Sequence, residues 1–129
     1  MKLGLEQVEQ IKIMDWVRFN NLDDFIFHIA NERQTTPQHG SILKRMGVKP
    51  GVSDIFCAKA KMGFHGCFIE LKVKGGKVSD SQKEFLQTVN AAGYLGVIRW
   101  SADEAIETLK EYLGIGDLIP KINMPPNCS

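Results

Sequence analysis

The sequence is poor in cysteine and has no paired-cysteine motif. Its three cysteines, Cys57, Cys67 and Cys128, are an odd number, and none are spaced as Cys-x-x-Cys. A disulfide framework or a structural zinc site would need such pairs. His65 lies near Cys57 and Cys67 but completes no paired spacing of zinc ligands. We therefore expect no structural zinc and a reducing, cytoplasmic setting, as in a bacterial or phage-infected cell.

Long apolar runs are also missing. No stretch approaches the roughly 18 apolar residues of a membrane span, and the first residues lack a signal-peptide core, so we expect no membrane partner. P-loop, GxGxxG and GxSxG motifs are absent too, which argues against the common nucleotide sites and the serine-hydrolase elbow. With 129 residues, of which 43% are hydrophobic and 24% charged, the chain fits one globular domain.

Positive charge is concentrated in the middle of the chain. Residues 44–83 contain nine Lys or Arg against three acidic residues, so this segment carries +6 and the remainder −5. Such a segment can bind a polyanion, although a solvated lysine-rich face explains the charge equally well.

The hydrophobic pattern predicts eight elements in the order α β α β β α β α. Two Ser-x-x-Gln/Glu capping boxes begin the last two helices. A strand–helix–strand crossover should make part of the sheet parallel. The prediction is a single α/β domain over residues 1–113, with a mixed sheet flanked by helices and a tail at 114–129. We expect helices near 5–19, 35–46, 79–92 and 101–113, and strands near 25–30, 54–59, 67–73 and 94–100.

Glu70 and Lys72 are two apart in a predicted strand, so their side chains leave the same face. Ile69, Leu71 and Val73 would then face the core. An alternating strand with one face in solvent would give the same pattern without any function.

Asp54 opens the preceding predicted strand, where its carboxylate can approach that of Glu70. Adjacent carboxylates repel unless a cation lies between them, and hard oxygen ligands suit Mg²⁺ or Mn²⁺. Lys72 would stabilise a hydroxide or the charge that develops on a phosphate. A common turn aspartate is the simpler alternative for Asp54.

Two further polar residues are weaker candidates. Gln82 lies one turn into the third helix and can orient a water or the lysine, although its capping box already explains it. Glu9 can supply a carboxylate from the first helix, although an exposed helical glutamate needs no function.

Three stretches together resemble a known family: Gly51-Val-Ser-Asp-Ile-Phe, Gly66-Cys-Phe-Ile-Glu-Leu-Lys and Gly75-Gly-Lys-Val-Ser-Asp-Ser-Gln. They are similar to the VRR-NUC (virus-type replication-repair nuclease) family of the PD-(D/E)xK nuclease superfamily, above all to its stand-alone phage and bacterial members. The similarity runs from about Glu9 to Leu113. The resemblance implies a PD-(D/E)xK nuclease fold.

The resemblance also implies roles for individual residues. It makes Asp54 and Glu70 metal ligands and Lys72 the catalytic lysine. It makes Glu9 the acid of the first helix, with Glu6 as the alternative. It gives the metal a backbone carbonyl from Ile69, and it places Gln82 in the family's Ser-x-x-Gln motif. Stand-alone members are similar in acting as homodimers on branched DNA such as four-way (Holliday) junctions.

The sequence departs from the family pattern at two places. Ser53 stands where the family usually has proline, and Asn31-Glu32-Arg33 replaces an Asn-Gly-Gly-x-Arg stretch. Asn31 and Arg33 therefore remain only candidate DNA contacts. The leading hypothesis is a Mg²⁺- or Mn²⁺-dependent DNA endonuclease. A non-cleaving DNA-binding module of the same fold is the alternative, and a scaffold without function would make every motif match an accident.

Overall fold

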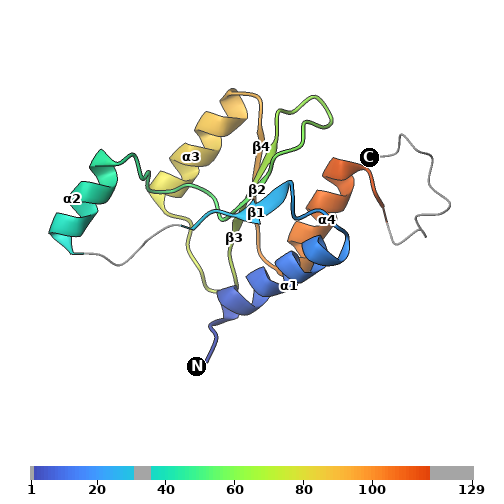
Figure 1. The fold of residues 1–129 in the computed structure, drawn as a ribbon, viewed down its shortest axis with the longest axis horizontal. Coiled ribbons are helices and arrows are strands. Elements are labelled where there is room, and N and C mark those ends of the chain that lie inside the picture. Colours follow the sequence, from blue (N-terminus) through green and yellow to red (C-terminus); the bar gives the residue numbers. More distant parts are fainter. Residues whose placement is uncertain (1, 31–35, 117–129) are drawn as a thin grey trace.

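The computed structural model describes residues 2–30 and 36–116, and these form the predicted succession of elements (Figure 1). The mixed α/β fold is confirmed, with strands shorter than the sequence suggested. The elements are α1 (Leu5–Phe19), β1 (Ile26–His28), α2 (Pro37–Arg45), β2 (Ile55–Cys57), β3 (Cys67–Leu71), α3 (Asp80–Ala91), β4 (Leu95–Arg99) and α4 (Ala102–Leu113).

The four strands form one sheet in the order β1-β2-β3-β4. β1 pairs with β2 and β2 with β3 in antiparallel fashion, while β3 and β4 are parallel. The parallel pair follows from the α3 crossover, as the sequence predicted. In the hairpin between β2 and β3, Met62 and Gly63 adopt positive φ angles of 52° and 83°.

Apolar packing is concentrated on the face of the sheet that α1 and α4 cover. Figure 1 shows this pair of helices on one side of the sheet and α3 on the other. The hydrophobic core includes Ile13 and Val17 of α1, Leu109 of α4, and Ile69 and Leu71 of β3, all fully buried or nearly so.

The opposite face of β3 is covered as well. The ring of Phe68 packs edge-on against Phe85 of α3, with ring centroids 5.0 Å apart. A strand that is half exposed to solvent, the alternative left open by the sequence, is therefore wrong for β3, because α3 crosses over this face.

The outer edge of β4 is closed by a side chain of α3. The amide of Asn90 accepts a hydrogen bond from the Gly96 N–H at 2.7 Å and donates one to the Gly96 carbonyl at 3.2 Å. The side chain thus satisfies backbone groups at an edge where a further strand would otherwise pair.

Helix α2 stands apart from the remaining elements (Figure 1). It has no buried residue, although Thr36 caps its first turn and Pro37 occupies the first helical position. No described helix is long and apolar enough to cross a membrane. The predicted tail lies outside the described residues from residue 117 onward, as do Asn31 and Arg33.

Candidate active site at the ends of β2 and β3

Asp54 lies immediately before β2, in a position fixed by its neighbours. Extending the β2–β3 register by one residue places it opposite Glu70. Its side-chain Oδ2 accepts a hydrogen bond from the Leu71 N–H at 2.8 Å. Its carbonyl oxygen accepts from the Ile29 N–H at 2.7 Å and from His28 Nδ1 at 2.8 Å. Backbone and side chain of this aspartate are therefore both oriented by adjacent strands.

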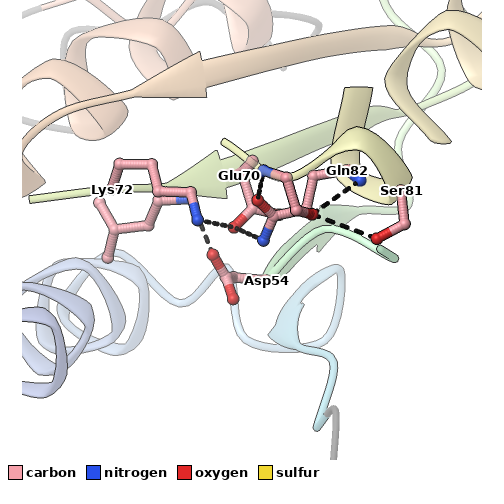
Figure 2. A network of polar contacts seen from close by, with 7 residues as sticks. Asp54, Glu70, Lys72, Ser81 and Gln82 are labelled. Atoms are coloured by element: carbon pink, nitrogen blue, oxygen red, sulfur yellow. Dashed lines mark hydrogen bonds and ion pairs between the residues drawn. The ribbon is translucent and has the colours of Figure 1, made fainter. Parts of the chain in front are cut away.

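Glu70 and Lys72 leave the face of β3 that α3 covers, and both side chains are buried. The exposed fraction is 1% for Glu70 and 6% for Lys72. Lys72 Nζ lies 3.9 Å from Glu70 Oε2. Figure 2 shows the Lys72 ammonium and the carboxylates of Asp54 and Glu70 pointing toward one another. The structure thus brings together the three residues on which the sequence hypothesis depends.

Gln82 connects this cluster to the start of α3. Its Oε1 accepts from the Ser79 N–H at 2.9 Å, and Ser79 Oγ accepts from the Gln82 N–H at 3.2 Å, which completes the predicted capping box. Its Nε2 donates to Glu70 Oε2 at 3.1 Å (Figure 2). Gln82 therefore caps the helix and contacts the site at once, because its Oε1 accepts from Ser79 while its Nε2 donates to Glu70.

Glu9 has its contacts at the start of α4. One carboxylate oxygen accepts from the Ala102 N–H at 3.1 Å, and the other lies 2.8 Å from Lys12 Nζ. The hydrogen bond from Lys12, and then that from Ala102, lower the pKa of Glu9 below its ordinary value. Because the Lys72 N–H donates to the Arg99 carbonyl at the end of β4, Glu9 and Lys72 belong to the same end of the sheet. The contacts described for Glu9 do not join it to Asp54 or Glu70, so its role in the site stays a prediction.

The donor set of the cluster fits a hard divalent cation. Two buried carboxylates face one lysine, and carboxylate oxygens are the donors that Mg²⁺ and Mn²⁺ prefer. Among residues 2–30 and 36–116, no three His, Cys, Asp or Glu side chains gather to hold a metal. A cation here would therefore have two carboxylate ligands, with waters or a carbonyl completing its shell, as is common for Mg²⁺. The carbonyl contribution of Ile69, whose side chain lies in the core, stays a prediction.

The described cysteines are placed differently. Cys57 and Cys67 pair across β2 and β3 in the apolar core, and both are free thiols. Burial raises the pKa of Cys67 to about 12 and also raises that of Cys57. Because the thiolate is the form that binds metals, this environment disfavours metal binding by either thiol.

Two positions that support the site were missed by the sequence reasoning. His28 was read only as part of a strand, although its ring donates to the Asp54 carbonyl, and the pairing of β1 with β2 that brings it there gives no local signal. Gly51 opens one of the family-like stretches, but the sequence does not indicate its contact with the start of α3. It has a φ of 85°, and a Cβ at this position would lie 2.3 Å from the Ser81 carbonyl oxygen and 2.9 Å from the Gln82 nitrogen. Glycine at this position therefore permits a close approach of two backbones.

The fold and the cluster define an α/β domain of the nuclease class, with acidic residues and a lysine where two adjacent strands meet the start of a helix. The sequence profile of the VRR-NUC domain matches residues 5–98, and the chain belongs to this family. It is also similar to a solved structure named "VRR_NUC domain protein", with a TM-score of 0.74 and 28% sequence identity over 91% of this chain and 94% of the other. None of the curated proteins compared with the sequence matches it. Membership of this family implies a nuclease-type function.

Proposed function

We propose that this protein is a Mg²⁺- or Mn²⁺-dependent endonuclease that hydrolyses phosphodiester bonds in DNA. The observation that carries the proposal is the convergence of Asp54, Glu70 and Lys72 in one buried cluster (Figure 2). Burying two carboxylates and an ammonium costs several kcal/mol per ion unless each is compensated, so chance does not readily produce this arrangement.

Each residue has a distinct part in the proposed reaction. Asp54 and Glu70 would hold the cation, with the Ile69 carbonyl as a further ligand. A bound divalent cation polarises a phosphate and lowers the pKa of a bound water. Lys72 would stabilise the hydroxide or the negative charge that develops at phosphorus, where a preoriented donor in a buried site is most effective. Gln82 would keep Glu70 in place through its hydrogen bond at 3.1 Å, and Glu9 would be the acid of the first helix, at the same end of the sheet but outside the two-carboxylate set.

We extend the proposal to branched DNA, such as four-way junctions, cleaved by a homodimer. The basic segment 44–83 supports DNA as the substrate, because phosphate contacts give salt-sensitive binding without sequence readout. The preference for branches and the dimer rest on the resemblance to stand-alone family members. Two active sites related by symmetry would suit a junction that offers two equivalent strands.

The decisive experiment is cleavage of labelled four-way junction, flap, duplex and single-stranded DNA with Mg²⁺ or Mn²⁺. Lys72→Ala should lower the rate by about two to three orders of magnitude, the typical effect of removing one charge-stabilising donor. Lys2→Ala is the control, because this exposed lysine lies outside the basic segment 44–83 and its variant should cut normally. Wild-type protein that binds DNA but cuts none of these substrates in either metal would replace the nuclease by the alternative, a non-cleaving DNA-binding module.

A further inference from the structure

The segment formed by α2 and the residues that lead to Gly51, residues 36–51, is here called the basic arm. Nothing in α2 is buried, and none of the main contacts between elements involves it. A helix of nine residues is too short to be stable on its own in water. The arm therefore has a surface that its own domain leaves uncovered.

The charge of the arm has one sign. Residues 36–53 contain Lys44, Arg45 and Lys49 and no aspartate or glutamate. All three cations are exposed. The ion pairs found among the described residues involve Lys12, Arg18, Lys72 and Lys110 and none of the arm cations. Three positive side chains that form no ion pair within residues 2–30 and 36–116 favour a polyanion as the occupant of this surface.

The last residue of the arm packs against the helix turn that contacts the active site. Gly51 lies directly against the backbone of Ser81 and Gln82 in the first turn of α3, with no room for a side chain. Gln82 in turn donates to Glu70. The arm thus leaves the body beside the residue that contacts the Glu70 carboxylate, and Figure 1 shows the segment after α2 passing beside the start of α3.

The distance from the arm to the active site is no longer than a DNA duplex of a few base pairs. Lys49 is five residues from Asp54, and an extended chain spans at most about 18 Å over that length. Successive base pairs advance about 3.4 Å along the duplex axis. Lys49 therefore lies within roughly five base-pair steps of a phosphate bound at Asp54, and the helix carries Lys44 and Arg45 outward from there.

We propose that the basic arm binds the DNA backbone that flanks the cleaved phosphate, an inference that rests on the proposed nuclease function. Ile42 and Met46 are 51% and 74% exposed, which would also suit a second copy of the chain. The run of cations argues for DNA, because two arms meeting each other would bring like charges together.

The test measures binding of four-way junction and duplex DNA to proteins that carry Lys72→Ala, so that no cleavage is needed, at salt concentrations from 50 to 200 mM. The arm variant is Lys44→Gln with Arg45→Gln. The control is Lys2→Gln with Arg18→Gln, which also removes one lysine and one arginine, both exposed and outside the arm. Two lost phosphate contacts should reduce the slope of log affinity against log salt by about two and weaken binding at least tenfold. The control should change affinity by less than twofold.

Unchanged affinity and salt slope in the arm variant would overturn the proposal. It would also be overturned if Ile42→Ser with Met46→Ser converted a dimer into monomers in sedimentation while the charge variant bound DNA normally, since the arm would then contact a second copy.

The nuclease proposal and the arm proposal fail separately. If the protein with Lys72 intact cuts nothing but the arm variant loses salt-dependent affinity, the nuclease fails and the arm stands. If the protein cuts DNA but the arm variant binds as before, only the arm fails.

Discussion

The two faces of β3 have opposite chemistry although they belong to one strand of five residues. One face sends Ile69 and Leu71 into the core beneath α1 and α4. The other face sends Glu70 toward the start of α3, and the residue after the strand end, Lys72, follows it with 6% exposure. Glu70 and Lys72 are buried like Ile69 and Leu71, so burial alone does not distinguish core from site.

The two faces of β3 differ in how the burial of their side chains affects stability. Burying a leucine or isoleucine contributes about 1.5–3 kcal/mol. Burying a carboxylate is unfavourable unless hydrogen bonds and opposite charge compensate it. Here Leu71 N–H and the Gln82 amide supply hydrogen bonds to the two carboxylates. We infer that the apolar face carries the stability and the polar face is retained for function.

The largest expected effect sets one face of β3 against the other. Leu71→Ala should lower the free energy of unfolding by about 2–5 kcal/mol through loss of buried surface and the cavity left behind. Glu70→Gln should lower it by less than Leu71→Ala without metal, because relief of repulsion with Asp54 and the retained acceptor for Gln82 offset the lost charge beside Lys72. Urea unfolding in a chelator measures both. Mg²⁺ should then stabilise the wild type but not Glu70→Gln. Equal losses of stability for the two variants would refute the inference that the apolar face of β3 carries the stability.

The second largest effect on stability is expected at the backbone contact between Gly51 and the start of α3. Gly47 and Gly51 both have positive φ, 97° and 85°, but only Gly51 lacks room for a Cβ. Gly47→Ala should cost about 1 kcal/mol of stability through its φ angle. Gly51→Ala should cost a further 1–3 kcal/mol, roughly the cost of overpacking, because the start of α3 must shift. Thermal unfolding compares the two proteins, and a cleavage assay should show a larger loss for Gly51→Ala. Indistinguishable variants would mean that the close approach does not constrain the site.

A smaller effect concerns the orientation of Asp54. His28 Nδ1 donates to the Asp54 carbonyl, and an asparagine amide can take the place of that nitrogen. His28→Asn should therefore keep Mn²⁺ affinity within about threefold, whereas His28→Gln and His28→Ala should lose roughly tenfold, as is usual for residues that orient metal ligands. Calorimetric titration with Mn²⁺ reads this directly. If all three variants bind Mn²⁺ alike, the histidine does not position the aspartate.

The smallest effect lies outside β3, at the junction of α1 with α4. Lys12 and the Ala102 N–H stabilise the charged form of Glu9 and lower its pKa below 4.5. Their contribution is present above pH 4.5 and is lost as the pH falls through the lowered pKa. Glu9→Gln should thus reduce stability by less than about 1 kcal/mol near neutral pH, and by progressively less as the pH falls through the lowered pKa. Urea unfolding across this range, with Glu6→Gln as the control on the same helix, checks it. A difference that grows toward low pH would contradict the assignment.

Much of the fold could be predicted from the sequence because its signals are local. Alternation in Cys67–Leu71 indicates a strand, and Ser79 with Gln82 marks a helix start. The parallel pairing of β3 with β4 follows from the helix between them. Asp54, Glu70 and Lys72 could be chosen because their residue types and spacing fit a known family pattern.

The remainder depends on contacts between segments far apart in the chain. The burial of Glu70 and Lys72 depends on α3 covering their face, and nothing in Phe68–Val73 indicates this cover. The bond from His28 to Asp54 depends on the register of β1, and the separate position of α2 shows only in three dimensions. Local patterns thus identify the candidate catalytic residues but not the groups that hold them.

The hydrogen bonds of the Gln82 amide also fix which end of the amide faces Glu70. Because the Ser79 N–H requires an acceptor, the oxygen of the amide faces the helix start, and the NH₂ end must face Glu70. The side chain cannot reverse without breaking both bonds, so Glu70 always meets a donor. While the first turn of α3 is wound, the Gln82 NH₂ group therefore stays directed at Glu70, and unwinding that turn would break the helix cap and the hydrogen bond to the carboxylate together.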